Sequence, residues 1–203
     1  MTEVRWHGRG GQGAKSVAEL LAAAMFRSGY YVQSFPEYGP ERSGAPLQAY
    51  TRYSNRPVRL HCGVTDPDVV VVLDDSLLGE VEVTQGLKRG GLLLVGTTKK
   101  SGAVAQEVGY DGPVVCIDST ALAAEAGARH GNVVMLGALA ALTGTPDLSS
   151  LKGAVEELFQ GRLSAQAMEA NRRALEIGFR CAPLKLETLT ASGTDYMGGT
   201  NGK

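Results

Sequence analysis

The stretch HGRGGQGAKS, residues 7–16, places four glycines within six positions, directly ahead of a run with helical spacing. Gly8, Gly10 and Gly13 fit the pattern G-x-G-x-x-G, and the preceding EVRWHG (3–8) has the character of a short strand. Glycine adopts positive φ and lets a ligand or a second chain approach the backbone, and amides at a helix start attract anions. The stretch therefore predicts a strand, a glycine loop (residues 8–13) and a helix.

Apolar runs alternate with helical patterns along the rest of the chain. This alternation is typical of an α/β fold with a mostly parallel, doubly wound, Rossmann-like sheet and helices on both faces. Ligands of such sheets bind beyond the carboxyl ends of the strands, where the glycine loop falls. We expect strands at 3–8, 30–35, 47–54, 58–61, 67–75, 90–96 and 112–118, with a hairpin across 55–57, and helices at 13–29, 76–88, 119–127, 132–144, 148–161 and 164–179.

Composition narrows the class of protein. The 203 residues are 43% hydrophobic with a net charge of −1, so one domain with a proper core is expected and nucleic-acid binding is not. We place the domain at 1–182 and an extended or partner-wrapping arm at 183–203, where periodicity is lost. No signal peptide or membrane span is indicated, and the three scattered cysteines, taken as free thiols, favour a cytoplasmic setting. Cys62, Cys116 and Cys181 are scattered and predict neither a metal site nor an iron–sulfur site on this chain alone.

The glycine loop is open to two interpretations. Its candidate cofactor-binding residues are Gly8, Gly10, Gly11, Gln12 and Gly13. A dinucleotide site needs an acid at the end of the second strand, and YYVQSF ends in Ser34 and Phe35 instead. The spacing of a P-loop is also absent, although Lys15 follows Gly13. A phosphate site and a turn that only packs strand against helix therefore both stay open.

A second glycine- and proline-rich segment, PEYGPERSGAP (36–46), carries charged residues in a stiff loop beside a strand. Such residues point to function more strongly than charges on a solvated helix face, although a surface loop with a local Glu41–Arg42 charge balance is the alternative. The candidate substrate and interface residues of this second loop are Pro36, Tyr38, Gly39, Glu41, Arg42, Ser43, Gly44 and Pro46.

The glycine loop and the second loop, in this order, resemble the γ subunit of the 2-oxoacid:ferredoxin oxidoreductases of the pyruvate, 2-ketoisovalerate and phenylglyoxylate type. The later NVVMLGALAALTG (132–144) is also similar to a helix of that family, and the resemblance spans most of residues 3–180. Ser43 stands where many pyruvate-type members have arginine, which leaves the 2-oxoacid open.

The resemblance implies one subunit of an enzyme complex, inactive alone and without catalytic residues or metal of its own. Such complexes oxidatively decarboxylate a 2-oxoacid with CoA to acyl-CoA and CO2, using thiamine diphosphate, Mg and 4Fe–4S clusters, and pass electrons to ferredoxin or another acceptor. The thiamine-binding and ferredoxin-like sites belong mainly to partner chains, while this chain contributes to the active-site wall, the CoA site and assembly. A free-standing nucleotide-binding oxidoreductase and a purely scaffolding subunit remain the alternatives.

Overall fold

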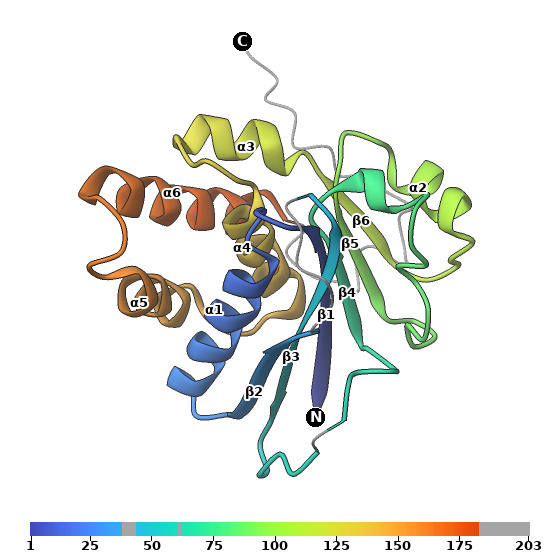
Figure 1. The fold of residues 1–203 in the computed structure, drawn as a ribbon, viewed down its shortest axis with the longest axis horizontal. Coiled ribbons are helices and arrows are strands. Elements are labelled where there is room, and N and C mark those ends of the chain that lie inside the picture. Colours follow the sequence, from blue (N-terminus) through green and yellow to red (C-terminus); the bar gives the residue numbers. More distant parts are fainter. Residues whose placement is uncertain (38–43, 61, 183–203) are drawn as a thin grey trace.

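Six strands form one sheet in the order β2-β3-β1-β4-β5-β6 (Figure 1). The computed structural model describes residues 1–37, 44–60 and 62–182, so the expected arm at 183–203 lies outside the described residues. Strands β1, β4, β5 and β6 pair in parallel, and β3 pairs antiparallel with both β1 and β2. The strands are β1 Thr2–Arg9, β2 Tyr31–Pro36, β3 Pro46–Ser54, β4 Val69–Val72, β5 Leu92–Gly96 and β6 Val114–Ile117. The predicted α/β fold is confirmed, with β3 as the reversed strand of a mixed sheet.

The sequence of each strand matches its place in the sheet. The runs VVVV of β4 and LLLV of β5 are buried throughout, as expected for strands covered on both faces. Strand β1 alternates instead, with Val4 and Trp6 in the larger core and Arg5 and His7 as buried polar residues. The two faces of the sheet therefore differ in chemistry at β1.

Helices cover both faces of the sheet, as predicted, but unequally (Figure 1). The larger core gathers residues of α1, α3, α4, α5 and α6 against one face, and the smaller one packs Val104 of α2 against β4, β5 and β6 on the other. Helix α4 crosses α6 so closely that a Cβ on Gly137 would overlap the Leu175 carbonyl, and one on Gly178 the Val134 carbonyl. The helices are α1 Ala14–Arg27, α2 Ser101–Val108, α3 Ser119–Ala126, α4 Asn132–Thr143, α5 Leu148–Phe159 and α6 Ala165–Cys181.

Three local predictions are wrong. The segment 58–60 is not a strand, so the antiparallel hairpin is β2–β3 and not one across 55–57. The segment 76–88 is not a helix: a 3-10 turn, Asp75–Leu77, is followed by turns. Helix α2, which was not predicted, buries only Val104, so its apolar periodicity is too weak to be recognised.

Buried arginines of the sheet bind the main chain within 76–88 and just after 58–60. Arg5 is 5% exposed and donates to the carbonyls of Val83 at 2.9 Å and Gln85 at 2.6 Å. Arg52 is 1% exposed, pairs with Glu3 and donates to the carbonyls of Cys62 and Gly63 at 3.2 and 3.3 Å. The Val83 and Gln85 carbonyls are drawn onto the polar face of β1, which accounts for the irregular course of the segment 76–88.

Candidate functional site

The glycine loop joins β1 to α1 at the carboxyl edge of the parallel strands. The Gly10 amide donates to the Ala45 carbonyl at 2.9 Å, and the Gly44 amide donates to the Gly10 carbonyl at 3.1 Å. The antiparallel register of β1 and β3 continues to this point, with Arg9 opposite Pro46. Two segments singled out by sequence, 35 residues apart at Arg9 and Gly44, therefore lie side by side.

Two glycines of the loop lie tightly against neighbouring side chains. A Cβ on Gly8 would lie 3.1 Å from the Ala14 Cβ and 3.3 Å from Leu73 Cδ1. A Cβ on Gly13 would overlap the Asn132 side-chain amide, which donates to the Gly13 carbonyl at 3.3 Å. Gly11, at φ +97°, would meet nothing within 4 Å, so its backbone conformation and not its surroundings favours glycine there.

The start of α1 offers amide groups at the same edge. Gly13 is the N-cap, in the left-handed conformation at φ 79°, and makes no side-chain capping bond. The first turn has no acidic residue, and Lys15 in that turn is exposed. An uncapped helix start next to a lysine has the chemistry to hold an anion.

Gln12 braces the loop from within. Its Oε1 accepts the Arg9 amide at 2.8 Å, and its Nε2 donates to Asp74 Oδ2 at 2.5 Å. Asp74 also caps the 3-10 turn after β4 by accepting the Ser76 amide at 3.0 Å. Partial burial acts to raise the pKa of Asp74, but hydrogen bonds from Ser76 and Gln12 and the charge of Arg9 hold that pKa below its usual value.

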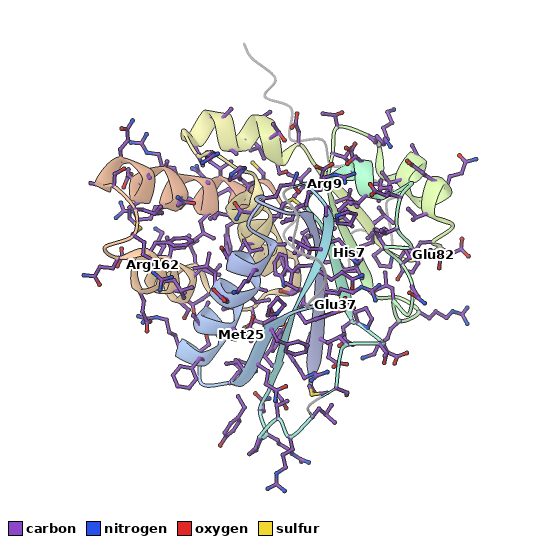
Figure 2. All side chains as sticks on the ribbon, viewed as in Figure 1. His7, Arg9, Met25, Glu37, Glu82 and Arg162 are labelled. Carbon is purple, nitrogen blue, oxygen red and sulfur yellow. The ribbon has the colours of Figure 1, made fainter. Side chains whose placement is uncertain are left out.

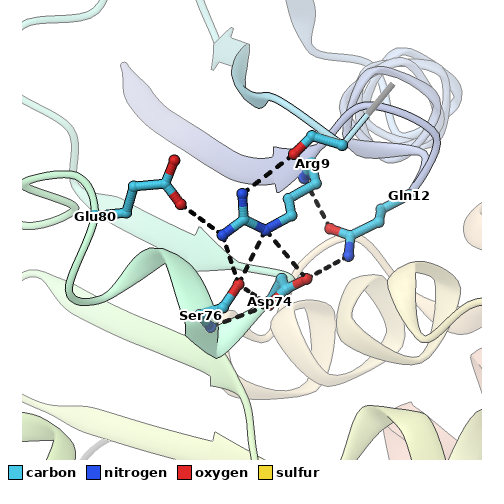
Figure 3. A network of polar contacts seen from close by, with 6 residues as sticks. Arg9, Gln12, Asp74, Ser76 and Glu80 are labelled. Atoms are coloured by element: carbon cyan, nitrogen blue, oxygen red, sulfur yellow. Dashed lines mark hydrogen bonds and ion pairs between the residues drawn. The ribbon is translucent and has the colours of Figure 1, made fainter. Parts of the chain in front are cut away.

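Figure 3 shows the Arg9 side chain at the centre of this edge, and Figure 2 places it at the end of the sheet far from the N-terminus. The guanidinium donates to Ser76 Oγ at 2.9 and 2.8 Å, to the Gly44 carbonyl at 3.1 Å and to Glu80 Oε2 at 2.6 Å. It also lies 3.7 Å from Asp74 Oδ2. Sequence reasoning missed Arg9, and its place between two glycines of a conformationally special turn was the available signal.

A cavity of about 560 Å³ lies elsewhere, over β2 and β3, and no residue of the glycine loop lines it. The Tyr50 hydroxyl donates to Glu37 Oε2 at 2.7 Å at its wall, and burial raises the pKa of Tyr50 above its usual value, with the Glu37 bond adding to the effect. Glu37 follows Pro36 at the start of the second loop. The remaining lining residues are Gln33, Ser34, Phe35, Pro36, Leu60, Cys62 and Gly63.

The other predicted site residues are placed unequally. Pro36 ends β2, Pro46 begins β3, and Gly44 contacts the glycine loop. Tyr38, Gly39, Glu41, Arg42 and Ser43 lie outside the described residues. Within the described part of the chain, no three His, Cys, Asp or Glu side chains are grouped to hold a metal ion, and no helix is long and apolar enough to cross a membrane.

The fold and these contacts define a Rossmann-like α/β domain in which two glycine-rich loops meet at the carboxyl edge of the sheet. The chain belongs to the pyruvate ferredoxin/flavodoxin oxidoreductase family, whose sequence profile matches residues 3–181. It is 42% identical over 178 residues to pyruvate synthase subunit PorC of Thermotoga maritima, covering 87% of this chain and 92% of that protein. It is 45% identical over 181 residues to the pyruvate/ketoisovalerate oxidoreductases common subunit gamma of Thermococcus kodakarensis, covering 88% and 96%.

Solved structures agree with this assignment. The pyruvate oxidoreductase subunit PORC of T. maritima superposes with a TM-score of 0.77 at 40% identity, covering 88% of this chain and 95% of that one. The gamma subunit of a keto/oxoacid ferredoxin oxidoreductase from Geobacter sulfurreducens gives a TM-score of 0.65 at 25% identity, covering 89% and 97%. The resemblance found in the sequence is thereby confirmed: the chain is a γ-type subunit of an oxidoreductase family.

Proposed function

We propose that this chain is the γ subunit of a complex that oxidatively decarboxylates a 2-oxoacid with CoA. In that reaction the 2-oxoacid loses CO2, the acyl group passes to the CoA thiol, and two electrons pass to ferredoxin or another acceptor. The match to γ subunits over nearly their whole length supports the proposal. The observation that carries it at residue level is the junction of the two loops through Gly10, Gly44 and Ala45.

The glycine loop and the start of α1 are the proposed CoA-binding part of this subunit. CoA carries several phosphate charges, and the uncapped amides of α1, the open space at Gly11 and the exposed Lys15 fit such an anion. We assign thiamine diphosphate, Mg and the 4Fe–4S clusters to partner chains, as the family resemblance implies. Thiamine diphosphate would supply the carbanion chemistry of decarboxylation, and this chain would supply the wall beside it.

The second loop is the proposed contact with the thiamine-binding and ferredoxin-like subunits. Its ends are fixed in this chain, at Glu37 by the Tyr50 hydroxyl and at Gly44 by the glycine loop. We further propose that the complex works in the cytoplasm. The chain is not a free-standing nucleotide-binding enzyme in this proposal, because β2 ends without the acid that a dinucleotide site needs.

A purely scaffolding role is the second candidate, and the packing demands at Gly8 and Gly13 favour it. The two candidates differ in a reconstituted complex assayed for CoA-dependent ferredoxin reduction. If the loop binds CoA, Lys15→Ala should raise the KM for CoA about two- to fivefold with assembly intact, because one exposed charge at a helix start is removed. The control is Lys88→Ala, which removes an exposed lysine paired with Asp68 ahead of β4. An unchanged KM for CoA would favour the scaffold.

A further inference from the structure

The end of the second loop is held to the glycine loop by hydrogen bonds. A Cβ on Gly44, at φ +82°, would meet nothing within 4 Å. The main chain of Gly10 bonds to Gly44 and Ala45, and the Arg9 Nη1 donates to the Gly44 carbonyl at 3.1 Å. Two adjacent residues of the glycine loop thus bind Gly44, Gly10 with its backbone and Arg9 with its side chain.

The orientation of the Arg9 side chain toward Gly44 is fixed by a closed ring of hydrogen bonds (Figure 3). The Arg9 amide donates to Gln12, Gln12 donates to Asp74, and the Ser76 hydroxyl donates to Asp74 at 2.6 Å while accepting from the Arg9 guanidinium. Each side chain in the ring has its orientation set by the next. The Arg9 guanidinium is therefore held in one direction, toward Gly44.

Arginine suits this task where lysine does not. The planar guanidinium has donors on three nitrogens, and here Nη1 serves Gly44 while Nε and Nη2 serve Ser76 and Glu80. An ammonium group is a single point charge and would satisfy the acids without reaching Gly44 at the same time. The side chains of Arg9 and Glu80 are 23% and 46% exposed, and ion pairs at such exposure add little to fold stability.

We propose that Arg9 is a positioning residue that sets the place of Gly44, at the described end of the second loop, relative to the glycine loop. The inference rests on the proposed function, because it gives the second loop its role at the junction with partner chains and the glycine loop its role toward CoA. Arg9 itself then touches neither substrate nor cofactor; it acts through Gly44.

The test compares Arg9→Ala, Arg9→Lys and Glu80→Gln in the reconstituted complex. Amide hydrogen exchange at Gly10 and Gly44 should quicken by roughly tenfold in Arg9→Ala, the effect of losing about one hydrogen bond. The KM for CoA or for the 2-oxoacid should rise by a similar factor, roughly tenfold, while the melting temperature of the complex stays near the wild-type value. Arg9→Lys should behave like Arg9→Ala, and Glu80→Gln like wild type, since it leaves the Gly44 bond in place.

Arg173→Ala is the matched control, because Arg173 is an exposed arginine of α6 whose pairing is with Glu169. Unchanged exchange at Gly44 in Arg9→Ala, or full rescue by lysine, would overturn the positioning role. Altered exchange together with an unchanged KM for both substrates, in Arg9→Ala and in Lys15→Ala alike, would instead count against the proposed function and leave the Arg9–Gly44 tether standing.

Discussion

Replacing Gly13 by alanine is the sharpest test of the geometry at the glycine loop. Gly13 has φ 79° and ψ 27°, in the left-handed region, where an alanine costs about 1–2 kcal/mol. The added Cβ would also overlap the Asn132 amide, with the Asn132 Cγ at 3.3 Å. That amide must rotate away and give up its bond to the Gly13 carbonyl, which costs about 0.5–1.5 kcal/mol more.

The expected loss for Gly13→Ala is therefore about 1.5–3.5 kcal/mol in the free energy of unfolding. Gly11→Ala is the matched control, since Gly11 has φ +97° but meets nothing within 4 Å. It should lose only the conformational part, about 1–2 kcal/mol. Chemical denaturation of the isolated chain measures both losses on one scale.

The decisive measurement repeats Gly13→Ala in a chain that also carries Asn132→Ala. Truncating Asn132 removes the amide that the new Cβ would meet, so the further cost of Gly13→Ala should fall to that of Gly11→Ala. If Gly13→Ala is no more costly than Gly11→Ala in the wild-type background, or if Asn132→Ala brings no relief, the close contact between the glycine loop and α4 does not decide the residue at position 13.

The remaining predictions concern pH, packing, the second loop and metal content. Burial, with the charge of Arg5, lowers the pKa of His7 from 6.5 to about 3, so the unfolded chain binds this proton first and stability falls as the pH drops from 6.5 toward 3. His7→Gln should remove up to about 1.4 kcal/mol per pH unit of that slope, and an identical slope by denaturation at several pH values would contradict it. Gly178→Ala should cost about 1–3 kcal/mol, because the Val134 carbonyl cannot move aside; an unshifted melting curve would argue against the close α4–α6 crossing. Arg42→Lys keeps the charge but loses the planar fork, so assembly or turnover of the complex should already drop, with Arg42→Ala worse; wild-type turnover in both would remove Arg42 from the site. Elemental analysis of the purified chain should find no stoichiometric iron. A chain that carries a cluster would contradict the prediction that its scattered cysteines form no iron–sulfur site.

Much of the fold could be predicted because its signals are local. The uninterrupted runs of β4 and β5 and the glycine stops after α3 and α4 identify their elements without reference to the rest of the chain. The failure at 76–88 has a different cause, a side chain far away in the sequence. The apolar spacing of 76–88 suits a helix, but Arg5 binds the carbonyls of Val83 and Gln85, and nothing within the segment itself announces that contact.

The candidate site divides in the same way. Gly8 and Gly13 stand out in the sequence because a glycine-rich turn between strand and helix has a known pattern. Arg9 does not, since its partners Gly44, Ser76 and Glu80 come from two later segments, before β3 and after β4, that the sheet brings together. The antiparallel strand β3 brings the two loops together, because it leads from the second loop directly alongside β1.

The two buried arginines of the sheet have a consequence for how this chain tolerates change. Arg5 and Arg52 bind the main-chain carbonyls of Val83, Gln85, Cys62 and Gly63, and every residue type carries such a carbonyl. These four contacts therefore do not depend on which side chain the position carries, whereas a one-residue insertion or deletion next to them would shift the carbonyls off the guanidinium groups. The number of residues between the sheet and each carbonyl therefore decides whether the two arginines find their acceptors.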